Sequence, residues 1–198
     1  LWKKMMSKVI KVEEIPIEVE DELLTMVEEA EIKGGIDEHE SKLIRSAIEF
    51  NDLDADQILT SRVDMISIPK ETTMEDVRKV FKENKFSRIP VYENNIDNII
   101  GVIHEKDFYD ALDEKKENID SIIKPILYVT SNTKISELLK KFQYIKNHMA
   151  VVIDEFGGTM GIITLEDVLE ELVGEIWDEH DEVVEYFKKL DEGKYNVM

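Results

Sequence analysis

Thr164 and Asp167 stand three residues apart, where a short apolar segment is predicted to pass from a strand into a helix. The first turn of a helix presents unpaired N–H groups and a partial positive charge, and both favour a bound phosphate. A threonine hydroxyl there could hold a phosphate, and an acid three residues later could hold the hydroxyls of a ribose. The same Thr-x-x-Asp spacing is also an ordinary capping box, and the spacing alone favours that structural role.

The segment that contains Thr164 has a counterpart earlier in the chain. Residues 101–107 and 161–167 share the pattern Gly-x-x-x-x-x-Asp at an offset of 60 residues. The same offset aligns the apolar residues 89–92 with 149–152. The helical segments before them align at an offset of 61 residues, which indicates that one single-residue insertion separates two copies of one unit.

Each copy is predicted to form a strand, a helix, two further strands and a second helix. Thr73 and Thr133 are expected to cap the first helix of each copy. The other expected elements are strands over 89–92, 98–103, 150–153 and 160–163, and a last helix over 165–176. A unit of about 60 residues is small for a separate core. We therefore expect the copies to pack as a pseudo-twofold pair with two equivalent clefts between them.

An acidic segment precedes the duplication: residues 13–54 include fifteen acids and three bases. Two helices are predicted here. The first ends at Gly34-Gly35, and the second begins after Asp37, with Glu40 completing a capping box. The acidic surface of this hairpin is expected to be solvated, in preference to binding a metal. The predicted fold class is α+β, with α/β-type repeats after an acidic helical hairpin over 20–55.

The composition argues against several classes of function. The 198 residues carry 45 Asp and Glu against 25 Lys and Arg, a formal net charge of -20. Such a field repels phosphodiester backbones, so we expect no nucleic acid partner. The chain has no cysteine, which excludes disulfides, cysteine nucleophiles and thiolate metal sites. No segment has the roughly 20 apolar residues of a membrane-spanning helix, so the chain as given is expected to be soluble.

The N-terminal segment 1–19 is open to two interpretations. It starts with Leu1 and carries a cluster of lysines ahead of its first acid, Glu13. The cluster consists of Lys3, Lys4, Lys8 and Lys11. Basic residues of this kind are typical of a segment next to a membrane helix on its cytoplasmic side. A frayed terminus is the favoured interpretation, and the start without methionine favours a piece cut from a longer chain.

Several strings carry a specific resemblance to a known family. They are TSRVD at 60–64, SRIPVY at 87–92, and HMAVVIDEFGG at 148–158, which leads into TLEDVLEELVGEI at 164–176. Together with the duplication, they resemble a tandem pair of CBS (cystathionine-β-synthase-type) domains, and more narrowly the pair of the CorC and hemolysin C-like membrane proteins, relatives of the cyclin M magnesium transporters. The resemblance covers roughly 20–182. It implies CBS domains over 56–120 and 121–178, and a truncated transporter-associated region over 179–198.

The resemblance implies that an adenine nucleotide, commonly ATP with Mg²⁺, binds between the two domains. Carried onto this sequence, Thr164 would contact the ribose or phosphate, Asp167 the ribose hydroxyls, and Arg88 the phosphates. The other implied nucleotide-binding residues are Thr60, Phe86 and Pro90 at the adenine end, Ile162 near the base or sugar, and Ile89. A permanently charged guanidinium suits a polyphosphate, especially in a chain whose average field repels anions.

The first copy departs from the family pattern. His104 stands where the hydroxyl is expected, although Asp107 is kept. An imidazole is larger than a hydroxyl and titrates near neutral pH. A degenerate position is therefore favoured over a second nucleotide site at His104 and Asp107.

A second acidic cluster lies near the C-terminus and contains Asp178, Glu179, Asp181 and Glu182. Carboxylate oxygens suit weakly bound Mg²⁺, so these four residues are weak candidates for a metal site. A solvated helix end or linker is the favoured role for such a cluster.

The leading hypothesis is a regulatory module without enzymatic activity. Nucleotide and Mg²⁺ would change the arrangement of the CBS pair, or its contact in a homodimer, and so act on the protein's own membrane domain, which exports divalent cations such as Mg²⁺ or Co²⁺. The expected location is the cytoplasmic face of the bacterial plasma membrane. The alternatives are a nucleotide-free dimerisation scaffold and, less favoured, a metal-dependent nucleotide hydrolase. The chain has no Gly-x-x-x-x-Gly-Lys phosphate loop.

Overall fold

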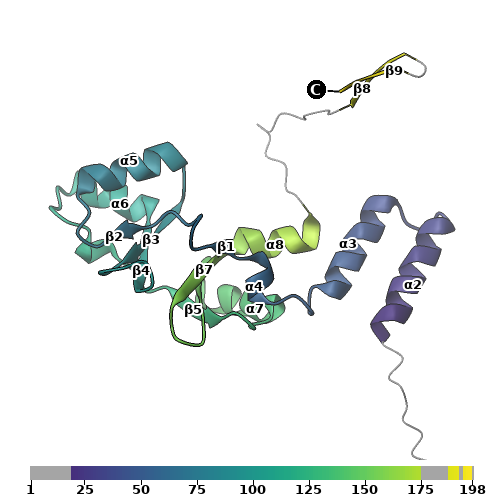
Figure 1. Ribbon diagram of the computed structural model, residues 1–198, viewed down its shortest axis with the longest axis horizontal. Coiled ribbons are helices and arrows are strands. Elements are labelled where there is room, and N and C mark those ends of the chain that lie inside the picture. Colours follow the sequence, from purple (N-terminus) through teal and green to yellow (C-terminus); the bar gives the residue numbers. More distant parts are fainter. Residues whose placement is uncertain (1–18, 175–186, 192–193, 198) are drawn as a thin grey trace, which may run out of the picture.

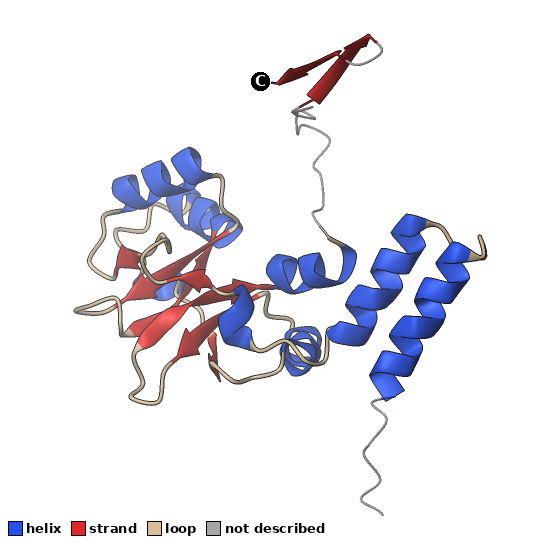
Figure 2. Cartoon of the chain, turned by 45° about the vertical axis from the view of Figure 1, so that its right-hand side comes forward, coloured by secondary structure: helices blue, strands red, loops and turns tan. Residues whose placement is uncertain are grey.

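The computed structural model describes residues 19–174, 187–191 and 194–197. Two sheets form its centre (Figures 1 and 2). The first sheet has the order β2-β3-β4, formed by Ile68–Pro69, Arg88–Tyr92 and Ile99–His104. The second has the order β1-β7-β6-β5, formed by Thr60–Ser61, Thr159–Thr164, Met149–Ile153 and Leu127–Thr130. A separate antiparallel pair consists of β8 (Phe187–Asp191) and β9 (Lys194–Val197).

The two copies share one order of elements. In repeat 1, from β2 to α6, the helix α5 (Met74–Asn84) connects the parallel strands β2 and β3, and α6 (Glu105–Asp113) follows β4. In repeat 2, from β5 to α8, the helix α7 (Ile135–Ile145) connects the parallel strands β5 and β6, and α8 (Leu165–Val173) follows β7. A short 3-10 helix, η1 (Asp120–Ile122), lies between the repeats. The predicted α+β fold with a duplicated unit is confirmed.

Each repeat has a core of its own, and a third cluster joins them. Phe81 and Phe108 lie in the core of repeat 1, and Phe142 lies in the core of repeat 2. The third cluster mixes residues of both sheets, with Val102 of β4 and Val151 of β6 among its fully buried members. The expectation that the two copies bury apolar surface against each other is confirmed.

The two sheets also exchange backbone segments. Strand β1 precedes repeat 1 in sequence but pairs with β7 of repeat 2, where Thr60 stands opposite Ile162. In return, Lys124 precedes repeat 2 in sequence but exchanges two backbone hydrogen bonds of 2.9 Å with Val102 of repeat 1. The duplication predicts two similar units. The structure shows in addition that the segment before each repeat pairs with a strand of the other repeat.

The acidic hairpin lies at the end of the molecule opposite to repeat 1 (Figure 1). It consists of α2 (Val19–Ile32) and α3 (Glu38–Glu49), and α3 packs against α8; the short helix α4 (Ala55–Ile58) follows. Asp37 and Glu40 form the expected capping box, and Gly34 has a φ of 72° in the turn. The predicted hairpin is confirmed. Among the residues that the structure describes, no helix is long and apolar enough to cross a membrane.

The alignment of the two copies needs one correction. Arg88 pairs with His104 at the open end of the β3–β4 hairpin, and Met149 pairs with Thr164 at the same place in β6–β7. Strands β3 and β6 therefore align at 61 residues, so aligning 89–92 with 149–152 is wrong by one position. The cause is a hairpin connection that is one residue longer in repeat 1 than in repeat 2. The structural counterpart of Arg88 is thus Met149.

Two predicted helix ends also differ. Lys134, not Thr133, is the N-cap of α7, and its side chain makes no capping hydrogen bond. Its Nζ instead lies 2.9 Å from Asp54 Oδ1 and donates to the carbonyl of Asp52 at 2.9 Å. At the other end of repeat 2, α8 ends at Val173 because Gly174 takes a φ of 77°. The expected continuation to residue 176 extends outside the described residues.

The difference between the two caps predicts unequal effects of mutation. Thr73 Oγ1 accepts a hydrogen bond from the backbone N–H of Asp76. Removing an N-cap oxygen costs about 1 kcal/mol, so Thr73→Ala is expected to lower the free energy of unfolding by that amount. Thr133→Ala removes no cap and is expected to cost less than about 0.5 kcal/mol. Urea unfolding of both variants measures the difference, and equal losses would contradict the assignment of Lys134 as the cap.

Candidate functional site

A cleft of about 250 Å³ lies between the two repeats. We call it the inter-repeat cleft. Its repeat 1 wall is the continuous segment 85–88, between α5 and β3. Its repeat 2 wall comes from three places: Met149 at the start of β6, Thr164 at the end of β7, and Glu166 in the first turn of α8. The cleft therefore joins the sequence strings that predicted a nucleotide site.

Local backbone geometry brings these residues together. Lys85 ends α5 with a φ of 55°, in the left-handed region, so the chain turns sharply into β3. Lys146 ends α7 in the same way, with a φ of 52°. The turn places Phe86 and Arg88 at the open end of the first sheet. Because Met149 stands opposite Thr164 in the second sheet, both face the same side of that sheet.

Thr164 and Asp167 form a capping box at the start of α8. Thr164 Oγ1 accepts from the N–H of Asp167 at 3.2 Å, and Asp167 Oδ2 accepts from the N–H of Thr164 at 2.7 Å. The structural role that the spacing favoured is confirmed. The capping box does not close the cleft, however. Thr164 still lines it, and the space beside Thr164 is open.

Phe86 and Arg88 give the repeat 1 wall its apolar and charged character. The Phe86 ring is 41% exposed, although it is a large apolar side chain. Arg88 is half-buried, and its Nε is buried with no hydrogen-bond partner among the described residues. A buried guanidinium N–H without an acceptor is costly. Because Arg88 lines the cleft, the charge of its guanidinium favours an anion there.

The remaining predicted residues lie around the cleft without lining it. Ile89 has no exposed surface and belongs to the core of repeat 1, so its side chain offers nothing to a ligand. Pro90 and Ile162 are also buried. Thr60 is exposed on β1, opposite Ile162. Of the sequence-predicted residues, Phe86, Arg88 and Thr164 line the cleft, whereas these four and Asp167 do not.

The matching position in repeat 1 has different chemistry. His104 is the N-cap of α6 but makes no capping hydrogen bond. Its Nδ1 lies 3.9 Å from Asp107 Oδ2, and the same carboxylate oxygen lies 2.6 Å from Lys124 Nζ. Burial lowers the pKa of His104 below its usual value, the positive charges of Lys124 and Arg88 lower it further, and Asp107 opposes the shift.

Sequence reasoning missed four residues that line the cleft: Lys85, Ser87, Met149 and Glu166. Met149 was assigned to the wrong position of the duplication, and the 61-residue alignment would have paired it with Arg88. Glu166 lies inside the conspicuous string Thr-Leu-Glu-Asp, between two residues that were selected. Lys124 was also missed, because nothing near it in sequence indicates a contact with Asp107.

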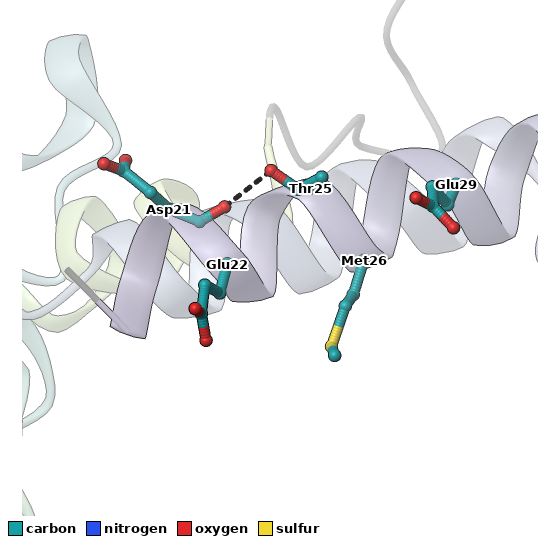
Figure 3. A pocket seen from close by; sticks show the side chains of 5 residues that line it. All are labelled: Asp21, Glu22, Thr25, Met26 and Glu29. Carbon is teal, nitrogen blue, oxygen red and sulfur yellow. Dashed lines mark hydrogen bonds between the residues drawn. The ribbon is translucent and has the colours of Figure 1, made fainter. Parts of the chain in front are cut away.

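Candidate metal ligands fall in two places. The cluster Asp178, Glu179, Asp181 and Glu182 lies outside the described residues. On the acidic hairpin, a pocket along α2 is lined by Asp21 and Glu22 near the N-terminus of the helix and by Glu29 nearer its C-terminus; Figure 3 shows these side chains. Across the part of the chain that the structure describes, no group of three or more His, Asp or Glu is arranged to hold a metal ion.

Comparisons with known proteins agree with this geometry. The CBS domain model matches residues 55–114 and 118–174. Hemolysin C of Brachyspira hyodysenteriae is 38% identical over 195 residues, which cover 98% of this chain and 69% of that protein. A solved structure of the CBS domain of the bacterial CNNM/CorC family Mg²⁺ transporter is 42% identical with a TM-score of 0.74, and the match covers 80% of this chain and 98% of that one.

A further solved structure shows such a CBS domain in complex with ATP. It is 43% identical with a TM-score of 0.65, over 69% of this chain and 99% of that one. Other relatives are much longer: the chain spans 29% of a DUF21 domain-containing protein of Arabidopsis thaliana to which it is 38% identical. The duplicated unit, the inter-repeat cleft and these matches together show that the chain belongs to the CBS-domain family, as a tandem CBS pair of the hemolysin C-like and CNNM/CorC group.

Proposed function

We propose that this CBS pair is a regulatory module that binds an adenine nucleotide in the inter-repeat cleft. One observation carries the proposal: Phe86, Arg88 and Thr164, selected from separate parts of the sequence, line a single cleft between the repeats. The ATP complex of the similar CBS domain supports the choice of ligand. The site would use Thr60, Pro90 and Ile162 as supporting walls, and the Ile89 side chain is left out because it is fully buried.

The chemistry of the cleft suits a nucleotide even though the capping box is formed. The Thr164 oxygen accepts a hydrogen bond from the backbone, and its O–H remains able to donate to a phosphate or ribose. The hydrogen bond from Thr164 N–H engages Oδ2 of Asp167, which leaves Oδ1 for ribose hydroxyls. The Phe86 ring offers an apolar surface for a base, and Arg88 offers a guanidinium for phosphates. Mg²⁺ would enter with the polyphosphate.

The regulatory role follows from the position of the cleft. A ligand changes a conformational equilibrium only if it binds the two states with different affinity. A nucleotide in this cleft would touch both repeats, so its affinity depends on how they are arranged. In the longer protein we propose that this change acts on an attached membrane domain exporting Mg²⁺ or Co²⁺, from the cytoplasmic face and through a homodimer of the CBS pair. The module itself is proposed to have no enzymatic activity.

Titration calorimetry with ATP, ADP and AMP, with and without Mg²⁺, tests the proposal. Arg88→Gln is expected to weaken ATP binding at least tenfold, because a charge-assisted contact to phosphate is lost. The matched control is Arg78→Gln, which removes the same charge from the exposed face of α5 and is expected to change affinity less than twofold.

A nucleotide-free dimerisation scaffold is the second candidate. The capping box favours it, since the cap already gives Thr164 and Asp167 a structural role. No heat of binding at millimolar nucleotide, combined with no thermal shift from any adenine nucleotide, would overturn the proposed function and leave the scaffold.

A further inference from the structure

Four residues occupy matching positions at the centre of the CBS pair. Arg88 stands opposite His104 in the first sheet, and Met149 stands opposite Thr164 in the second. Directly opposed residues of antiparallel strands lie on the same side of the sheet, with Cβ atoms about 5 Å apart. Arg88, Met149 and Thr164 line the inter-repeat cleft. His104, the fourth member, therefore lies beside Arg88 at the edge of the cleft.

The repeat 1 side of this centre holds two permanent cations and one carboxylate around His104. His104 is surrounded by the permanent cations Arg88 and Lys124, by a second imidazole, His148, and by the carboxylate of Asp107. The matching positions in repeat 2 hold the uncharged side chains of Met149 and Thr164. In a chain with a net charge of -20, a local excess of cations needs a physical reason. A bound anion is the simplest one, and Arg88 lines the cleft that would hold it.

The ion pair between Lys124 and Asp107 decides which anion fits. Asp107 is the counterpart of Asp167, and Lys124 Nζ lies 2.6 Å from its Oδ2. The carboxylate that would hold the ribose of a second nucleotide therefore has its charge balanced by a lysine, through one of its two oxygens. His104 also lacks the short hydroxyl side chain of Thr164. This side retains the charge to hold phosphate but not the groups to hold a nucleoside.

On the basis of the proposed function, we propose that the repeat 1 side of the centre holds the terminal phosphates of the one nucleotide bound in the inter-repeat cleft, with protonated His104 as a phosphate contact. The phosphate chain would run from Thr164 past Arg88 towards His104. Each CBS pair then binds one nucleotide. The ligand class is an adenosine di- or triphosphate, because the single phosphate of AMP stays near Thr164 and Arg88.

The contact makes nucleotide binding depend on pH. The surroundings of His104 decide whether the affinity rises or falls as the pH is lowered. Without ligand, burial and the charges of Lys124 and Arg88 hold its pKa below the usual value, so the imidazole is neutral at pH 7. Phosphate oxygens beside it stabilise the imidazolium and raise that pKa. Binding then takes up a proton, and the affinity for ATP rises as the pH falls. Asp107 favours protonation of His104 in both states.

The experiment compares dissociation constants of ATP and AMP, both with Mg²⁺, at pH 8 and pH 6. For the wild-type chain, ATP affinity is expected to rise about five- to tenfold at the lower pH, and AMP affinity less than twofold. His104→Gln is expected to remove most of the rise for ATP. His39→Gln, on the exposed face of α3, is the matched control and is expected to behave as wild type. The titration of the phosphate itself, near pH 6, is common to all variants and cancels in the comparison.

Two further readouts keep the outcomes separate. Calorimetry of the wild-type chain in two buffers of different ionisation enthalpy counts the proton taken up without any mutation, and one nucleotide per chain is the expected stoichiometry. An unchanged pH dependence in His104→Gln, its loss in His148→Gln instead, or two nucleotides per chain would overturn this inference and leave the proposed function standing. Absence of all nucleotide binding would instead overturn the proposed function.

Discussion

Replacing Phe108 by alanine is expected to lower the free energy of unfolding by about 4 kcal/mol. Phe108 lies on α6 with no exposed surface, and its ring centroid is 5.3 Å from that of Phe81 on α5. Truncation removes the apolar surface that holds these two helices together and leaves a cavity that a packed core closes only in part. Guanidinium unfolding followed by circular dichroism measures the loss.

Phe156 provides the control for the Phe108 prediction. It lies in the β6–β7 connection and is 94% exposed, so Phe156→Ala removes the same atoms from a position without packing. Its expected cost is below about 0.5 kcal/mol. Similar losses for the two variants would mean that the core of repeat 1 is not where the structure places it.

Gly161→Ala is expected to cost about 3 kcal/mol, an unusually large effect for adding one methyl group. Gly161 stands on β7 opposite Ser61 of the paired strand β1, and a Cβ atom there would overlap the carbonyl oxygen of Thr60 and lie 2.8 Å from Leu59 Cδ1. The obstacle is mainly backbone, which cannot rotate away, so β1 must separate from the second sheet. Thermal unfolding would record the loss as a lower melting temperature, by about 6 to 12 °C.

Gly35→Ala is the matched control for Gly161→Ala. Gly35 lies in the turn between α2 and α3, and a Cβ atom there would lie 3.4 Å from its nearest neighbour, the carbonyl oxygen of Ala30. We expect a change of less than about 0.5 kcal/mol. If Gly161→Ala were as mild as Gly35→Ala, the close approach of the Thr60 carbonyl to Gly161 would be refuted.

The sequence predicted best those features, such as helix caps, that depend on residues close together in the chain. Asp37 with Glu40, and Thr73 ahead of Asp76, are local signals, and both helices begin where those signals place them. The order of strands and helices in each repeat follows from periodicity, which is also local. Thr133 failed as a cap because the position that matches Thr73 at the 61-residue offset is Lys134, so a threonine one residue too early was chosen for its side-chain type.

The candidate site was predicted in part, for a physical reason. Thr164 was found from its type and spacing, Phe86 and Arg88 were found from the resemblance to CBS pairs, and the structure brings all three to one cleft. The ion pair between Lys124 and Asp107 could not be found, because it depends on which sheet each leading segment joins. This pairing depends on a close backbone approach at Gly101 and Gly161. The carbonyl oxygens of Lys124 and Thr60, respectively, fill the space that a side chain at these glycines would need.

Because β1 and the Lys124 segment each pair with the other repeat, the molecule cannot be divided between the repeats without breaking these pairings. A fragment with only the second CBS domain, residues 118–174, would lose β1 and expose the edge of β7, whose free N–H and C=O groups invite aggregation. The first domain alone, residues 55–114, would keep β1 without a partner and lose the bridge at Val102. We expect either half alone to be less stable than the pair, so chimaeras that recombine such proteins should transfer both domains together.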